Sequence, residues 1–347
     1  MANAGSTLRS ALKVGLHRSG ALAAVRRWRD NPHQMVVLQY HSVSPDLGAA
    51  SYRSPYISVT PELFDRQVAH LARHYRVISL DEAVDRLCAG TPFPPRAVAI
   101  TFDDGYRDNY THALPILTRH GVTATFFVTA GPVVHGERFW VAWLREAVHR
   151  APDAVGVARA LGIPCEGWEE SEQQREWLVD LITRRVCQSD LREREAIMAV
   201  VEEHTGDTDC WTADYMLTPE EVEEMHAAGM TIGSHTCSHP ILARLEPETA
   251  ARELAESRQL LESVIGAPVR HLAYPNGPGG ENFDATTMRL AEAAGYRSAC
   301  TSERGPLSLS TPQFALTRRG IDDPQGFSGF VFRLEQHHLE RWKGERG

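Results

Sequence analysis

Short apolar runs and amphipathic segments alternate along this chain, and this alternation restricts the fold more than any other feature of the sequence. The first helical segment starts with Thr60 as a candidate N-cap and Pro61 in the first turn, where proline is tolerated. Parallel strands need a crossover connection, usually a helix, so this order predicts a mostly parallel sheet covered by helices. The predicted strands cover 35–43, 77–80, 97–102 and 123–130, and the helices between them cover 60–75, 81–90 and 109–121.

The alternation stops at about residue 137 and resumes at about residue 230, which predicts a helical insertion of unusual length for an α/β connection. Seven or eight strands in this order predict a closed or nearly closed (β/α) barrel, with an open doubly wound sheet as the main alternative. The later strands cover 230–235, 271–277, 296–301 and 314–322, the helices cover 247–266 and 284–295, and a closing helix starts at 326. The predicted units are a basic helix or arm (1–34), the first part of the barrel (35–136), the insertion (137–229) and the second part of the barrel with the C-terminal helix (230–347).

Composition and charge restrict the partners of the protein. A net charge of -9 argues against nucleic acid as a general partner, because no basic field would collect phosphates. The six cysteines are scattered, which predicts a reducing compartment and hence a cytoplasmic location, although an extracytoplasmic location stays open. The basic first thirty residues predict either contact with an anionic membrane surface or a solvated helix.

Polar residues follow several predicted strands at the point where each strand ends. In a parallel barrel the carboxyl ends of all strands meet on one face, where catalytic residues of such barrels lie. These polar residues are therefore expected to come together at one site. They are His41, Asp103 and Asp104, His235, the segment from Tyr274 to Gly277, and Arg318 with Arg319.

The two adjacent aspartates and a pair of histidines predict a metal site. His235 and His239 are four residues apart, so one helical turn or a tight turn could direct both imidazoles at one point. Two histidines and one carboxylate, Asp104, form a ligand set that leaves positions on a divalent ion open, and Asp103 would remain as a free base. Each motif alone is weak, and two surface histidines are the ordinary alternative. Cys237 lies between the histidines and is expected to point away from the ion.

Three motifs resemble those of the polysaccharide deacetylases, the NodB-homology fold of carbohydrate esterase family 4. They are "TFDDG" (101–105), "SHTCSH" (234–239) and "YPNG" (274–277), and the resemblance runs from about residue 35 to residue 322. It implies a distorted (β/α)7 barrel, here with a helical insertion. It also implies that Asp103 is the catalytic base, and that Asp104, His235 and His239 bind a divalent metal, with zinc as the expected ion.

Two departures from the family pattern leave roles open. No L-x-H motif is found near the C-terminus, and "LQYHSV" resembles the branch with a Tyr-His pair on its first strand, so His41 is the candidate general acid. A histidine that binds substrate is the alternative for His41. The third motif is altered, and its Tyr274, Pro275 and Asn276 are expected to bind substrate together with Arg318, which could also place a positive charge near Asp103.

The resemblance implies a hydrolase that removes N-acetyl groups from an amino-sugar glycan or glycoconjugate and releases acetate. An O-acetyl esterase of the same fold and a non-catalytic carbohydrate-binding module are the alternatives. Trp140 and Trp143 open the insertion, where they could stack on sugar rings or belong to a core. The sequence predicts neither the glycan nor the oligomeric state.

Overall fold

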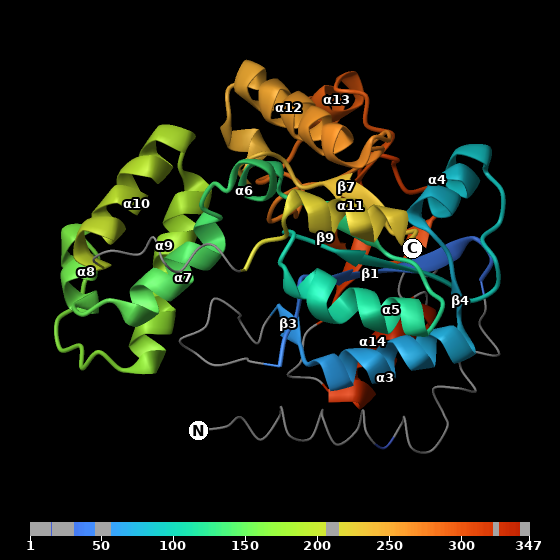
Figure 1. The fold of residues 1–347 in the computed structure, drawn as a ribbon, viewed down its shortest axis with the longest axis horizontal. Coiled ribbons are helices and arrows are strands. Elements are labelled where there is room, and N and C mark those ends of the chain that lie inside the picture. The colour runs from blue at the N-terminus through green and yellow to red at the C-terminus, as the bar shows by residue number, and fades with distance from the viewer. Residues whose placement is uncertain (1–14, 16–30, 46–56, 206–214, 322–325, 341–347) are drawn as a thin grey trace.

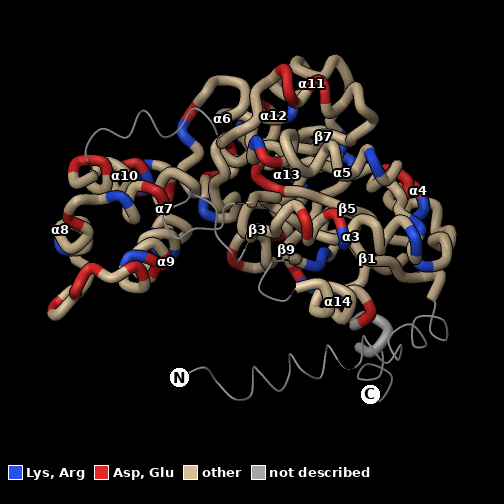
Figure 2. Tube along the Cα trace, turned by 60° about the horizontal axis from the view of Figure 1, so that its bottom comes forward, with Lys and Arg blue, Asp and Glu red and all other residues tan. Residues whose placement is uncertain are grey.

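A computed structural model of the chain describes residue 15 and residues 31–45, 57–205, 215–321 and 326–340 (Figure 1). The basic N-terminal arm lies outside the described residues except at residue 15 and residues 31–34, so its predicted contact with a membrane stays a prediction. None of the helices in the described ranges has the length and apolar character that a bilayer crossing requires. Acidic and basic positions are interspersed over the described trace (Figure 2).

A closed barrel of parallel strands forms the centre of the molecule. β1 closes the ring because it pairs in parallel with β5, from Val36 opposite Val98 to Tyr40 opposite Phe102. This closure confirms the predicted (β/α)7 barrel and excludes the open doubly wound sheet. In order around the ring, the strands are β1 (Gln34–Tyr40), β11 (Leu316–Gly320), β9 (Ser298–Arg304), β8 (His271–Ala273), β7 (Thr231–Ser234), β6 (Thr125–Val128) and β5 (Ala97–Phe102).

Helices cover the outside of the ring, and several of their caps follow from the sequence. The Thr60 hydroxyl accepts a hydrogen bond from the Leu63 amide, with Pro61 in the first turn, as predicted for the first helix. The outer helices are α3 (Pro61–His74), α4 (Leu80–Ala89), α5 (Leu114–Arg119), α6 (Ala130–His135), α11 (Pro219–Ala227), α12 (Pro247–Ile265), α13 (Ala285–Ala293) and α14 (Gly326–Glu340), with short turns η1 (Asn109–Ala113) and η3 (Leu242–Arg244).

Some predicted boundaries differ from the structure. The strand expected at 77–80 is only β4 (Arg76–Val77), because Ser79 caps α4, which begins one residue later. The helix expected at 109–121 begins with the π-helical turn η1, and β8 ends at Ala273, before the proline of "YPNG". The short strands β2 (Ser42–Val43), β3 (Ser58–Val59) and β10 (Leu307–Ser308) were not predicted as separate elements.

Side chains of the barrel strands alternate between the interior and the surrounding helices, as the two-residue period of a strand requires. Val36 and Tyr40 belong to the cluster that includes Phe64 of α3. The interior is apolar at the amino ends of the strands, where Val37 and Ala99 pack together. Towards the carboxyl ends the same faces carry buried polar residues: Gln39, Thr101 and Arg318.

Four helices of the insertion pack on each other beside the barrel (Figure 1). Trp143 is fully buried and Trp140 is 7% exposed, so both tryptophans belong to this core and neither offers a free face for a sugar ring. α11 lies within the predicted insertion of 137–229 but packs against α12 and β7 of the barrel, so the helices that form the separate core end earlier than predicted. The four helices are α7 (Trp140–Arg150), α8 (Ala154–Ala160), α9 (Glu172–Gln188) and α10 (Leu191–Thr205).

Candidate active site

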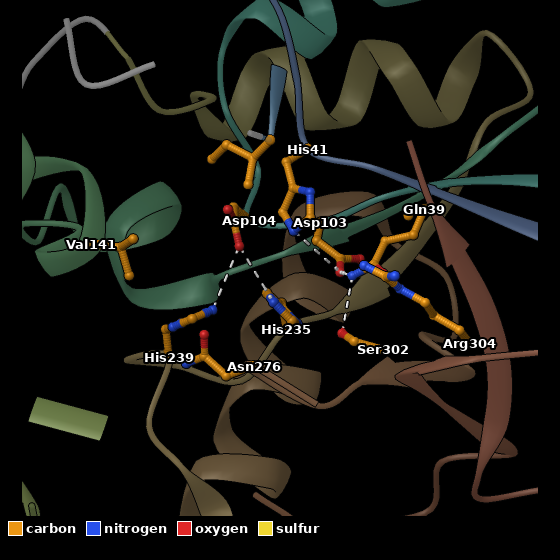
Figure 3. A pocket seen from close by; sticks show the side chains of 12 residues that line it. Gln39, His41, Asp103, Asp104, Val141, His235, His239, Asn276, Ser302 and Arg304 are labelled. Atoms are coloured by element: carbon orange, nitrogen blue, oxygen red, sulfur yellow. Dashed lines mark hydrogen bonds and ion pairs between the residues drawn. The ribbon is translucent and has the colours of Figure 1, made fainter. Parts of the chain in front are cut away.

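A cavity of about 310 Å³ lies at the carboxyl ends of the barrel strands (Figure 3). It brings together most of the residues that the sequence predicted for the site, from segments far apart in the chain. Val141 of α7 places one residue of the insertion on its wall. The cavity is lined by Gln39, His41, Ile57, Asp103, Asp104, Val141, His235, His239, Asn276, Ser302, Arg304 and Gly320.

The turn after β5 separates the two adjacent carboxylates. The Gly105 amide donates to the Asp103 carbonyl at 3.0 Å, and Asp104 has a φ of 75°, a conformation that is strained for a residue other than glycine. Gly105 follows with a φ of 89°, and a Cβ there would lie 3.2 Å from the Val128 side chain. The tight turn directs Asp104 towards the two histidines and leaves Asp103 on the other side of the cavity (Figure 3).

Asp104, His235 and His239 form a compact group of buried donor atoms. Asp104 Oδ1 lies 3.4 Å from His235 Nε2 and 3.5 Å from His239 Nε2. A tetrahedral ion with bonds of about 2.0–2.2 Å holds its ligands about 3.3–3.6 Å apart, so these separations fit a divalent cation. The three side chains are 3–7% exposed, and one donor atom from each lies within 4.8 Å of the others. Cys237 is not part of this group.

The orientation of the histidines agrees with a ligand role. His235 Nδ1 lies 2.7 Å from the Ala273 carbonyl, which requires a proton on Nδ1 and directs Nε2 at Asp104. Burial alone would lower the pKa of His235, but the hydrogen bond to Asp104 and the charges of Asp103 and Asp104 raise it, so a cation at Nε2 would compete with a proton. Burial lowers the pKa of His239 to about 3, so this imidazole is neutral. The donor set therefore fits a divalent cation in chemistry as well as in spacing.

Asp103 occupies the opposite side of the cavity, and Arg318 and Gln39 hold its carboxylate. The Arg318 guanidinium donates to both oxygens, at 2.6 Å and 2.7 Å, and Gln39 Nε2 donates to Oδ2 at 2.8 Å. Burial alone would raise the pKa of Asp103, but the charge of Arg318 and that of His235 hold it well below its usual range. Asp103 is therefore ionised and fixed in orientation.

The sequence profile of the family described as "Polysaccharide deacetylase" matches residues 90–158 and 191–299. The chain belongs to this family, whose members are hydrolases. The chain is 23% identical over 304 residues to the Bacillus subtilis protein YxkH, which bears the name of a polysaccharide deacetylase; the match covers 87% of this chain and 76% of YxkH.

Two further relatives are similar over different lengths. The poly-β-1,6-N-acetyl-D-glucosamine N-deacetylase of Escherichia coli K12 is 34% identical over 99 residues, which are 28% of this chain and 14% of that protein. The solved structure of the Streptococcus pyogenes deacetylase PplD in complex with acetate has a TM-score of 0.59 and 20% identity, with 88% of this chain and 99% of that chain covered. The likeness to the solved structure confirms the fold of the chain.

Two residues that the sequence assigned to substrate binding lie behind the cavity wall. The prediction of direct contact has to be revised for Arg318, because its side chain is fully buried and also bonds Thr101 and the Thr301 carbonyl. The other prediction for Arg318, a positive charge near Asp103, agrees with the structure. Tyr274 is 1% exposed, its hydroxyl donates to the Phe314 carbonyl, and its ring stacks on Phe283.

Of the remaining groups of the altered third motif, only Asn276 faces the cavity. Tyr274 N–H donates to the Cys300 carbonyl, so this amide is not available to a bound oxyanion. Pro275 is not among the lining residues, whereas Asn276 lines the cavity near His239 (Figure 3). Asn276 is therefore the residue of this motif that is placed to contact a substrate.

His41 lies at the end of β1, on the same side of the cavity as Asp103 (Figure 3). Its Nε2 is 3.9 Å from Asp103 Oδ2, and its side chain is 23% exposed. It is thus accessible from the cavity while close to the carboxylate. This position suits both alternatives left open by the sequence, a proton donor and a group that binds substrate.

Sequence reasoning missed Gln39 and Ser302, which are hydrogen-bonded to each other at 3.2 Å beside Asp103. A signal for Gln39 was present in "MVVLQYH", where a glutamine interrupts an apolar strand two residues before His41. Residues two apart in a strand face the same side, so the glutamine and the histidine are expected on the same face of the strand. Ser302 had no comparable signal.

Proposed function

We propose that this protein is a metal-dependent deacetylase that removes N-acetyl groups from an N-acetylated amino-sugar glycan or glycoconjugate and releases acetate. The observation that carries the proposal is the convergence of Asp104, His235 and His239 on one point beside an unligated, ionised Asp103. The name of the Escherichia coli relative, a poly-β-1,6-N-acetyl-D-glucosamine N-deacetylase, supports an amino-sugar substrate.

Asp104, His235 and His239 would hold the cation, and one oxygen and two nitrogen donors suit zinc. A divalent ion held there acts as a Lewis acid that lowers the pKa of water and polarises the acyl oxygen. That contribution is needed, because a carboxylate as weakly basic as Asp103 cannot deprotonate ordinary water efficiently.

Asp103 acts as the general base in this proposal. It accepts the proton of the attacking water while Arg318 and Gln39 hold both carboxylate oxygens in place. Attack on the acetyl carbon gives a tetrahedral adduct, whose C–N bond then breaks. His41 donates a proton to the departing amine nitrogen, so the products are acetate and a free amino sugar.

The role of His41 can be separated from substrate binding through the leaving group. An amine departs only with a proton, whereas p-nitrophenolate departs without one. His41→Gln should lower kcat on an N-acetylated oligosaccharide by about 100-fold or more, and leave kcat on p-nitrophenyl acetate within about threefold. Equal losses on both substrates would exclude the general-acid role.

The proposed activity is tested by acetate release from N-acetylated oligosaccharides with β-1,4 and β-1,6 linkages, after the protein has been loaded with Zn²⁺, Co²⁺ or Ni²⁺. O-acetylated xylan oligosaccharides serve as the alternative substrates, and Asp103→Asn is the inactive control. Release from the N-acetylated set alone supports the proposal. Release from the O-acetylated set alone would indicate the esterase, and binding without release would indicate a carbohydrate-binding module.

A further inference from the structure

The loop that carries the two histidine ligands, residues 235–239, accepts hydrogen bonds from and donates them to side chains of other elements on two sides. On the barrel side, Glu253 of α12 accepts hydrogen bonds from the Cys237 and Ser238 amides, at 2.9 Å and 3.0 Å. It also accepts the Ser238 hydroxyl at 2.8 Å. The amide groups of the loop are thus held by the barrel.

The insertion holds the last two carbonyl groups of the same loop. Arg194 of α10 donates to the Ser238 carbonyl at 2.8 Å and to the Ser238 hydroxyl at 3.2 Å. The Trp140 indole of α7 donates to the His239 carbonyl at 3.2 Å. Two different helices of the insertion therefore bond directly to the segment that carries the ligands.

The loop needs this support because its backbone is strained. Thr236 has a φ of 69° and His239 a φ of 55°, in the left-handed region that side chains other than glycine rarely adopt. Such residues keep their conformation only when the surroundings fix them. Within the loop, Thr236 Oγ1 accepts the His239 amide at 3.1 Å. From outside the loop, amides of α6 donate to the Thr236 and Cys237 carbonyls, at 2.9 Å and 3.0 Å, and side chains of α12 and of the insertion hold the end of the loop.

The two histidines are oriented in different ways. His235 is oriented through its Nδ1, which donates to the Ala273 carbonyl of β8. His239 Nδ1 is buried and has no hydrogen-bond partner among the described residues. Its ring is packed instead against Phe139, edge to face at 5.4 Å between centroids, and against Trp140 at 6.0 Å. Both aromatic rings belong to the start of the insertion.

We infer that the helical insertion is a positioning element for the metal site, which fixes His239 through Arg194 and Trp140. This inference rests on the proposed metal-binding role of Asp104, His235 and His239. It assigns the insertion a function in addition to its contribution to the cavity wall, and it makes Arg194 and Trp140 positioning residues rather than catalytic ones.

The test measures the affinity of the full chain for Zn²⁺ by competition with a chromophoric chelator, and the visible absorption of the Co²⁺-loaded protein. Arg194→Met removes both bonds to Ser238, and Trp140→Phe removes the indole donor but keeps an aromatic ring. Loss of partners that orient metal ligands weakens binding about 10–100-fold, and we expect a decrease in this range for Arg194→Met. Arg194→Lys should recover part of the affinity.

Arg185→Met is the matched control. Arg185 lies in α9 and donates to the Leu161 carbonyl at 2.7 Å, so its loss weakens the insertion without touching the ligand loop. We expect Arg185→Met to bind Zn²⁺ with wild-type affinity and to keep the wild-type Co²⁺ spectrum, whereas Arg194→Met and Trp140→Phe change both.

Two results would overturn the inference. One is wild-type Zn²⁺ affinity in both Arg194→Met and Trp140→Phe. The other is an equal loss in Arg185→Met, which would indicate general destabilisation of the insertion. Failure of the proposed function is distinguishable from both, since the wild-type protein would then bind no stoichiometric metal, or His235→Ala would bind it as tightly as the wild type.

Discussion

The two sides of the cavity are built differently, although they meet at adjacent residues. The Asp103 side is made by barrel strands alone. Asp103 follows β5, and the two side chains that hold its carboxylate are Gln39 of β1 and Arg318 of β11. The Asp104 side depends on a strained turn and on a strained loop, and the loop is held by α6, by α12 and by the insertion. The comparison teaches that the closed barrel interior fixes the charge of the base, while the geometry of the ligands depends on a barrel strand for His235 and on peripheral helices for the loop that carries His239.

The largest effect is expected from a substitution that removes a metal ligand and leaves the Asp103 side unchanged. His235→Ala removes one of three donors, so the purified protein should lose its metal from about one ion per chain to background, together with all measurable activity. Elemental analysis checks the metal content. His135→Ala, an exposed histidine at the end of α6, is the matched control and should keep the ion. Full occupancy in His235→Ala would remove this histidine from the ligand set.

The next effect breaks the base side while sparing the ligands. Asp103→Asn cannot accept a proton, so acetate release should fall by about 10²–10⁴-fold. The metal content should not change, because the asparagine lies outside the donor group. Turnover and bound metal are measured in parallel on the same preparation. Wild-type turnover in Asp103→Asn would show that another group is the base.

Removal of the counter-ion of the base should appear chiefly in stability. Arg318→Met leaves a buried carboxylate without its fully buried partner, and the free energy of unfolding should fall by about 3–5 kcal/mol. Urea denaturation measures this change. Arg304→Met, an exposed arginine on the cavity wall, should change the free energy of unfolding by less than about 0.5 kcal/mol. Similar small changes in both variants would contradict the role of the buried pair.

The smallest effect is expected from the loss of a single hydrogen bond to Asp103. Gln39→Ala removes one of the hydrogen bonds that hold Asp103 but keeps the Arg318 pair. We expect about a tenfold decrease in kcat/KM, equivalent to about 1.4 kcal/mol, with unchanged Zn²⁺ affinity. A loss of metal in this variant would show that the two sides are coupled more closely than their separate supports suggest.

Sequence periodicity and residue type predicted the barrel and most of the site, because both depend on local rules. Strand ends gather on one face of a parallel barrel, so Asp103, Asp104 and the two histidines could be expected to meet before any distance was known. The closure of the ring by β1 and β5 could not be decided from local pattern, because a closed barrel and an open sheet share the same order of elements.

The parts that sequence could not predict depend on contacts between distant segments. The Arg318 fork joins residues 215 positions apart, and Arg194 reaches a loop 44 positions away. No local period marks such pairs, and an arginine on a strand looks the same whether it faces substrate or a buried carboxylate. For this reason the sequence predicted both substrate contact and a positive charge near Asp103 for Arg318, of which the structure shows the second, and the link between insertion and ligand loop was not predicted.

The position of β11 also determines when the active site can form. Although it is the last barrel strand along the chain, it lies between β1 and β9 in the ring. Protein synthesis delivers the N-terminal segments first, so the strand with the base exists before the strand with its guanidinium. A nascent chain that does not yet include β11 thus has an open-sided barrel and no neutralising partner for the base, so the site can be complete only after β11 has been synthesised and has joined the ring.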